Sequence, residues 1–234
     1  MDEATLKYLI SAKKSLPFRI QEHLFLLNAT GTIYWPAKRL LVVSDLHFEK
    51  ASFLAQQGAP LPHYDTHATL LKLSADINQF KPAMVVCLGD SFHDLGAWRR
   101  LGSAERAQLF SLVQDCERWV WIEGNHDPEL PLELPGERHS ELQSEGVVFT
   151  HEPHNGAAEV FQVVGHFHPK LRKRVARQTM SGRCFAAGKQ LLIMPAFGAY
   201  TGGLDVADKA FEHVLPKRQR QYFLLHQDCI YAIK

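Results

Sequence analysis

The sequence has no long apolar run and almost no net charge, and each absence argues against a class of protein. No stretch approaches the roughly 18 consecutive apolar residues that a membrane-spanning helix needs, so no membrane partner is expected. The lysines near the start are not followed by the apolar run of a signal peptide, and a cytoplasmic location is expected. The formal net charge is +1, so the charge of the whole molecule indicates neither nucleic acid nor a membrane surface as partner.

Cysteines are also few and scattered. The chain has 4 cysteines among its 234 residues, and none stands in a Cys-x-x-Cys pair. Cys87 and Cys229 have mainly apolar neighbours, which is typical of buried reduced thiols and not of a disulfide framework. Apolar residues make up 46% of the chain, as in ordinary soluble proteins. Since no repeat, low-complexity segment or linker is present, a single domain is expected over residues 1–234.

Apolar runs and turn residues predict an α/β fold. In the first half we expect a β-hairpin at 21–35, strands at 40–43, 83–88 and 119–122, and helices at 64–80 and 105–116. The second half has few helical signals, and we expect short strands at 147–150, 160–164, 191–194, 222–225 and 230–233. Strands that alternate with helices run parallel, and active sites lie at their carboxyl ends.

Side chains that bind metals stand at the ends of these strands. Asp45 and His47 follow the strand 40–43, and alternate residues of a strand point to the same side, so both are expected to face one pocket. The same spacing recurs at His166 and His168. Other strand ends carry Asp90, Asn125, His126 and His151. Glycines stand directly before Asp90, Asn125 and His166, where we expect close backbone packing or unusual dihedral angles.

Each of these residues alone has an ordinary explanation, because a single histidine after a strand is more often a surface or core residue than a ligand. Their recurrence at five strand ends is hard to explain as turn chemistry. The oxygen and nitrogen donors are more than one ion takes up and suit two divalent ions that share a carboxylate and a water. Two ions about 3.5–4 Å apart provide hydroxide near neutral pH and neutralise phosphoryl oxygens, so phosphoester hydrolysis is the expected chemistry.

Asp-x-His, Gly-Asp, Gly-Asn-His-Asp, a single His and Gly-His-x-His, in this order, resemble the calcineurin-like metallophosphoesterase superfamily. The resemblance implies a four-layer αββα sandwich, with two mixed β-sheets flanked by helices. It also implies that the first metal is held by Asp45, His47 and His168. By the same resemblance, Asp90 bridges both ions, and the second metal is held by Asn125, His151 and His166.

His126 matches the superfamily histidine that is not a ligand, which stabilises the transition state and protonates the leaving oxygen. Histidine suits this role because its pKa lies close to neutral pH. Asp94 or Asp127 is expected to orient it, and Asp127 has the alternative of a helix N-cap before Pro128. The superfamily's usual Gly-Asp-x-x-Asp is here Gly-Asp-x-x-x-Asp, and the Gly-Asp-x-x-Asp-Arg of Ser/Thr protein phosphatases is absent, which argues against a protein substrate.

A narrower resemblance covers nearly the whole chain. The motifs Asp-Leu-His-Phe-Glu-Lys-Ala, Gly-Ala-Pro-Leu-Pro, Gly-Asp-Ser-Phe-His-Asp, Gly-His-Phe-His-Pro and Pro-Ala-Phe-Gly-Ala-Tyr-Thr-Gly-Gly are similar to those of the ligase-associated DNA damage response endonuclease family. This resemblance implies a Mn²⁺-dependent phosphodiesterase or endonuclease that cuts DNA by attack of a metal-bridging hydroxide, with a role in DNA repair and a functional association with a DNA ligase and a helicase. The ligand types alone equally accept Fe, Zn or Ni.

A basic segment directly follows the last ligands and is a candidate binding site for phosphates of DNA. Its residues are Lys170, Arg172, Lys173, Arg174 and Arg177, and further cations stand at Arg99, Arg100, Lys217, Arg218 and Arg220. The alternative is that these are solvated surface positions. Phe197, Tyr200 and Thr201 in the late glycine-rich loop either border a substrate groove or pack in the interior.

Two other functions share the same motifs. A metallophosphatase or phosphodiesterase acting on a nucleotide or another small molecule would keep every ligand and differ in the groove. A non-catalytic scaffold is disfavoured, because such proteins usually lack His126 or some of the ligands, and this chain has them all. The sequence leaves open whether subunits pair into a homo-oligomer.

Overall fold

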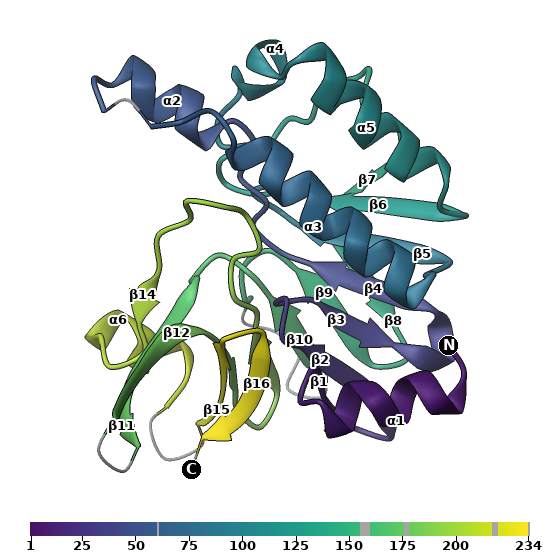
Figure 1. Cartoon of the computed structure of the whole chain (residues 1–234), viewed down its shortest axis with the longest axis vertical. Helices are drawn as coiled ribbons and strands as arrows, with labels where there is room; N and C mark the ends of the chain where they lie inside the picture. Colours follow the sequence, from purple (N-terminus) through teal and green to yellow (C-terminus); the bar gives the residue numbers. More distant parts are fainter. Residues whose placement is uncertain (60, 155–159, 176–177, 217–219, 234) are drawn as a thin grey trace.

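The computed structural model describes residues 1–59, 61–154, 160–175, 178–216 and 220–233 (Figure 1). Its first sheet has seven strands in sequence order. The first four, which pair antiparallel, are Ser15–Ile20 (β1), His23–Asn28 (β2), Ile33–Trp35 (β3) and Leu40–Val43 (β4). The others continue from β4 in parallel and are Met84–Leu88 (β5), Arg118–Ile122 (β6) and Glu137–His139 (β7).

The second sheet has nine strands and is also mixed. Its parallel centre consists of Val147–Thr150 (β9), Phe161–Val164 (β10) and Leu191–Ile193 (β13). Around the centre lie Glu141–Ser144 (β8), Pro169–Val175 (β11), Gln178–Ala187 (β12), Leu204–Asp205 (β14), Gln221–His226 (β15) and Cys229–Ile233 (β16). The first part of β12 pairs with β11, and its last residues pair with β13 and β15.

Helices cover the outer face of each sheet. Those associated with the first sheet are Glu3–Ser11 (α1), Lys50–Gln56 (α2), Asp65–Phe80 (α3), Ala97–Arg100 (α4) and Ser103–Gln114 (α5), and a 3-10 turn, Pro36–Lys38 (η1), precedes β4. Lys209–Val214 (α6) packs on the second sheet through Phe211. In the described ranges, no helix is both long and apolar enough to cross a bilayer.

Strand alternation divides the interior into layers. On β4, Leu41 and Val43 belong to the cluster beneath the helices, whereas Leu40 and Val42 belong to the cluster between the two sheets. A third cluster lies between the second sheet and α6. The order is therefore helices, sheet, sheet, helix, and the predicted four-layer αββα arrangement is confirmed.

The predicted elements of the first half agree with the structure to within two residues at most of their ends, since each has a clear apolar period. The predicted strands of the second half are also present. The largest element missing from the predictions is the hairpin of β11 and β12. The sequence did not reveal it because β11 has few apolar residues and charged residues separate them. Before the first predicted element, the chain forms α1 and β1.

Candidate metal centre

The segments that follow β4 and β5 lie side by side and carry the first candidate ligands. The Asp45 amide donates to the Gly89 carbonyl at 3.3 Å, and the His47 amide donates to the Asp90 carbonyl at 2.9 Å. One residue further, the Phe48 amide donates to the Ser91 carbonyl at 2.8 Å. These backbone bonds extend the β4–β5 pairing past the ends of the strands and hold the side chains of both segments at one edge of the sheet.

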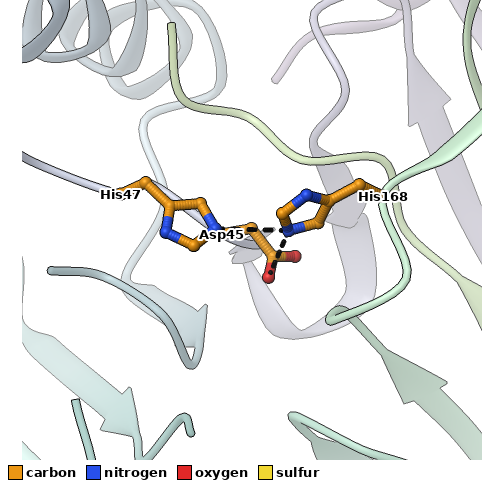
Figure 2. Close-up of side chains that lie close together, drawn as sticks. All are labelled: Asp45, His47 and His168. Carbon is orange, nitrogen blue, oxygen red and sulfur yellow. Dashed lines mark hydrogen bonds and ion pairs between the residues drawn. The ribbon is translucent and has the colours of Figure 1, made fainter. Parts of the chain in front are cut away.

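Asp45, His47 and His168 form one group of converging donors (Figure 2). The Nε2 of His168 lies 3.0 Å from Oδ1 of Asp45 and 3.3 Å from Nε2 of His47. Asp45 and His47 are buried, and His168 is half-buried. The structure thus brings together the three side chains expected at the first metal.

Asp90, His151, His166 and Asn125 form a second group. The Oδ1 of Asn125 lies 2.8 Å from Nε2 of His151 and 3.0 Å from Nδ1 of His166. The Oδ1 of Asp90 lies 3.4 Å from Nε2 of His151. Its other oxygen, Oδ2, lies 3.9 Å from Nε2 of His47 in the first group. Asp90 therefore stands between the groups, as the expected bridging carboxylate should.

The donor chemistry of these groups fits two divalent cations. The set consists of carboxylate oxygens, imidazole nitrogens and one amide oxygen, which suits Mn, Fe, Zn or Ni. The outer nitrogens are oriented by hydrogen bonds, since Nδ1 of His151 lies 2.8 Å from the Leu88 carbonyl and Nδ1 of His47 lies 3.2 Å from Nδ1 of His93. Bonds of this kind fix the tautomer and direct Nε2 at the ion.

The electrostatics favour ionised carboxylates and a neutral His47. Burial opposes ionisation of Asp90, but the hydrogen bond and charge of His151 outweigh it and lower the pKa of Asp90. Burial lowers the pKa of His47 to about 3. Burial also opposes protonation of His151, yet the hydrogen bond to Asp90 and the charges of Asp45 and Asp90 raise its pKa to about 9. A cation that binds at neutral pH must therefore displace a proton from His151.

The candidate ligands have an unusual backbone conformation. Positive φ values occur at Asp45 (+54°), His47 (+45°), Asp90 (+47°), His166 (+66°) and His168 (+46°). Residues with side chains adopt this left-handed region at a cost, and such strain concentrates at functional sites. The sequence correctly paired Asp45 with His47, but the assumed reason was wrong, because both residues lie beyond the end of β4 and do not alternate along a strand.

The glycines next to these ligands are needed for close packing, as the sequence predicted. A Cβ atom on Gly165 would lie 2.6 Å from Oδ2 of Asp45, and one on Gly124 would lie 2.2 Å from the amide nitrogen of Asp90. At Gly89, whose φ is +70°, the added atom would lie 2.4 Å from Nδ1 of His151. A side chain at any of these positions would displace a candidate ligand.

His126 lies beside both groups and is held by backbone contacts. Its amide donates to Oδ1 of Asp90 at 2.9 Å, and its Nδ1 lies 2.8 Å from the His93 carbonyl. Its ring stacks on that of His93, with centroids 5.0 Å apart and an interplanar angle of 20°. The group that orients His126 is therefore the His93 carbonyl, and the expectation that Asp94 or Asp127 does so is corrected.

The two aspartates have other partners. Asp94 binds the Arg100 guanidinium and accepts from the Gly96 amide at 2.7 Å. Asp127 is buried and accepts from the amides of Asp90 and Phe92, both at 3.0 Å, and of Gly124 at 3.1 Å. Burial raises the pKa of Asp127 to about 7, and the charge of Asp90 adds to this effect. Asp127 therefore fixes the turns that carry Asp90 and Asn125.

His93 was not singled out from the sequence as a site residue. It contacts His47 through Nδ1, and its carbonyl orients His126. Burial and the positive charge of Lys50 lower the pKa of His93 to about 4, so its ring is neutral at pH 7. The only sequence signal was its place three residues after Asp90 in the Gly-Asp-Ser-Phe-His motif.

The basic residues have varied environments. Lys170 and Lys173 are half-buried, and Arg172 and Arg174 are exposed. Arg177, Lys217 and Arg218 lie outside the described residues. Arg100 pairs with Asp94, and Arg220 binds the carbonyls of Leu215 and Val206, so these two have structural roles.

The late glycine-rich loop is hydrogen-bonded to the backbone of the segment that carries Asp45. The Phe197 amide donates to the Ser44 carbonyl at 2.9 Å, and the Gly198 amide donates to the Asp45 carbonyl at 3.1 Å. The Phe197 carbonyl accepts from Nζ of Lys72 on α3 at 3.0 Å, and the Ala196 carbonyl accepts from Arg183 on β12 at 2.6 Å. Phe197 is buried and therefore packs in the interior instead of lining a groove.

Comparison with known proteins agrees with the phosphoesterase chemistry that the ligand groups indicate. A search of curated proteins finds no match. Among solved structures, the chain is similar to one titled "Crystal structure of Pseudomonas putida nuclease MPE", with a TM-score of 0.72 and 26% sequence identity over 94% of this chain and 100% of that one. The sequence model of calcineurin-like phosphoesterases matches residues 38–183, which include every candidate ligand. The chain belongs to the calcineurin-like phosphoesterase family.

Proposed function

We propose that this enzyme is a two-metal phosphodiesterase that cuts DNA. The observation that supports this most directly is the pair of adjacent ligand groups with Asp90 between them and His126 beside them. Asp45, His47 and His168 would hold one ion, Asn125, His151 and His166 the other, and Asp90 would bind both. Bound divalent ions would supply Lewis acidity that neutralises the phosphoryl oxygens and lowers the pKa of water.

His126 would provide the proton for the leaving group. The attacking water first loses a proton to solvent; its oxygen then forms a bond to phosphorus as the bond from phosphorus to the leaving oxygen breaks, and the leaving oxygen takes up a proton from His126. The Nδ1–H of His126 is donated to the His93 carbonyl, so the proton that can be transferred is the one on Nε2. Because the backbone amide of His126 is tied to Asp90, the ring stays at a fixed position relative to the ligands.

DNA is proposed as the substrate on two grounds. The similar solved structure is a nuclease, and a basic strand starts directly after His168. We further propose Mn²⁺ as the metal, a role in DNA repair, and functional association with a DNA ligase, in line with the family that the motifs resemble.

The test compares three substrates in the presence of Mn²⁺: a supercoiled plasmid, bis(4-nitrophenyl) phosphate and 4-nitrophenyl phosphate. We expect nicking of the plasmid and hydrolysis of the diester, both abolished by Asp90→Asn. His126→Ala should strongly reduce nicking and should reduce hydrolysis of the diester much less. Nicking that persists in Asp90→Asn would show a contaminating nuclease. Hydrolysis of the monoester without nicking would replace the proposal by a small-molecule phosphatase.

A further inference from the structure

The basic segment forms strand β11, and strand alternation separates its cations onto two faces. Leu171 is buried in the cluster that contains Phe211 of α6, so odd-numbered positions face that cluster. Lys173 lies on the same side as Leu171. Lys170, Arg172 and Arg174 lie on the opposite face, and the two arginines are exposed.

The neighbouring strands determine what surrounds this face. Across the antiparallel pair with β12, Arg172 is opposite Ser181 and Arg174 is opposite Thr179, so small hydroxyl side chains lie beside the arginines. Arg183, opposite Lys170, is already bonded to the carbonyls of Ala196 and Phe197.

Lys170 is the member of this row nearest to the candidate metal centre, since it lies two residues after His168. Its aliphatic stem packs against Gly203, where a Cβ atom would lie 2.6 Å from Cγ and Cδ of the lysine. Asp205 of β14 lies beside Lys170 in the sheet and places a carboxylate next to this lysine. The excess of positive charge on this face therefore lies further from the candidate metal centre, at Arg172 and Arg174.

We propose that Lys170, Arg172 and Arg174 form a row of phosphate-binding side chains for the part of a nucleic acid strand that flanks the cleaved bond, and that Lys173 is not part of it. The proposal rests on the proposed function and assigns the surface along which the bound strand extends away from the metal centre. At 3.3–3.4 Å per residue, the row is about 13 Å long. It therefore extends beyond the reacting phosphate and can contact only substrates longer than a simple diester.

The variant Arg172→Ala/Arg174→Ala tests the row, and Lys173→Ala, one position away on the other face of the strand, is its matched control. Binding of a fluorescein-labelled single-stranded oligonucleotide is measured by anisotropy at several salt concentrations, with His126→Ala present in every protein to prevent cleavage. Each lost phosphate contact should reduce the slope of log affinity against log salt by about 0.7. Cleavage of the same oligonucleotide and of bis(4-nitrophenyl) phosphate is then compared in proteins with His126 intact.

We expect the double variant to bind at least tenfold more weakly, with a slope reduced by more than 1, and to lose at least ten times more kcat/KM on the oligonucleotide than on the small diester. Lys173→Ala should bind within twofold of its parent. The inference would be overturned if the double variant and Lys173→Ala lost the same amount of oligonucleotide affinity. An unchanged salt dependence of binding by the double variant would also overturn it. If the His126→Ala protein binds DNA through the row but the wild type, with His126 intact, never cleaves DNA, the proposed function fails and the row stands. If the parent does not bind DNA, the row is refuted.

Discussion

At the scale of single residues, the contacts of His126 distinguish its role from that of the ligands. Its Nδ1 donates a hydrogen bond to the His93 carbonyl, and its backbone amide donates one to Oδ1 of Asp90. In the proposed reaction, a residue held in this way acts on the proton transfer without holding a metal. The same contacts explain why neither Asp94 nor Asp127 is needed to orient the ring.

We therefore expect His126→Ala to lower kcat on DNA by about 10²–10⁴-fold, the usual contribution of a general acid. The loss should be much smaller on bis(4-nitrophenyl) phosphate, because nitrophenolate leaves without protonation. Steady-state kinetics on both substrates, with Mn²⁺ binding measured by calorimetry, provide the check. An equal loss on both substrates would contradict the assignment of His126 as proton donor.

Asp127 has a structural role that a substitution should reveal. Asp127→Ala leaves the amides of Asp90, Phe92 and Gly124 without their acceptor in a buried turn. Unsatisfied buried donors cost about 1–3 kcal/mol each, so we expect the free energy of unfolding to fall by at least 2 kcal/mol in urea titrations. Asp94→Ala, which removes a half-exposed partner of Arg100, is the comparison and should cost less than 1 kcal/mol, in the range of exposed ion pairs. A larger loss of free energy of unfolding in Asp94→Ala than in Asp127→Ala would contradict the structural role of Asp127.

The candidate ligands were predictable from the sequence because their types and order are distinctive, and the structure brings all of them together. Their backbone conformation was not predictable, since nothing in the residue types at Asp45 or His168 signals a positive φ. His93 was not identified because its contribution is made partly by a carbonyl group, which every residue has.

At the scale of elements, α3 and the loop that follows β13 are joined by a half-buried lysine, Lys72. Lys72 donates to the Phe197 carbonyl and lies over the Phe197 ring, with Nζ 3.6 Å from its centroid. Burial, reinforced by the charge of Arg183 and opposed by that of Asp76, lowers the pKa of Lys72 from 10.5 to about 7. Between these values the unfolded chain binds a proton at Lys72 that the folded protein does not.

The stability of the fold should therefore rise with pH between about 7 and 10.5 through Lys72, and its contribution should be lost as the pH falls to 7. We expect the wild type to gain about 2 kcal/mol in free energy of unfolding relative to Lys72→Met between pH 7.5 and 9.5. Urea titrations at both pH values measure this difference. Lys7→Met, at an exposed lysine on α1, is the control and should show no such change; a constant difference for Lys72→Met would contradict the shifted pKa.

The hairpin of β11 and β12 shows which elements sequence reasoning does not find. The strands at the centre of the sandwich are apolar on both faces and are recognised easily. On β11, by contrast, one face carries Lys170, Arg172 and Arg174, and Leu171 is its clearest buried residue on the other. Which cations share a face is known only once β11 is known to be a strand, and its charged sequence does not predict that it pairs with β12.

At the scale of the whole molecule, each ligand group draws on both sheets. Asp45 and His47 follow β4 of the first sheet, whereas His168 lies between β10 and β11 of the second. In the second group, Asp90 and Asn125 follow β5 and β6, whereas His151 follows β9. A cation in either group would link the two sheets.

Metal binding should therefore stabilise the entire sandwich. With Mn²⁺ at 100 times its dissociation constant, we expect the free energy of unfolding to rise by about 2.7 kcal/mol for each site, relative to protein treated with EDTA. Thermal unfolding with and without Mn²⁺ measures the effect. His126→Ala should keep the increase and Asp90→Ala should lose most of it; an increase that survives Asp90→Ala would place the ions elsewhere.

The distribution of the ligands along the chain also has a consequence for biosynthesis. Asp45, His47, Asp90 and Asn125 are translated first, but the second group gains its histidines only at positions 151 and 166, and the first group is completed only by His168. A nascent chain that ends before His166 holds no complete group. The capacity to hydrolyse a phosphodiester thus arises only when the second sheet has begun to form, so a fragment that contains the first sheet alone would lack this activity.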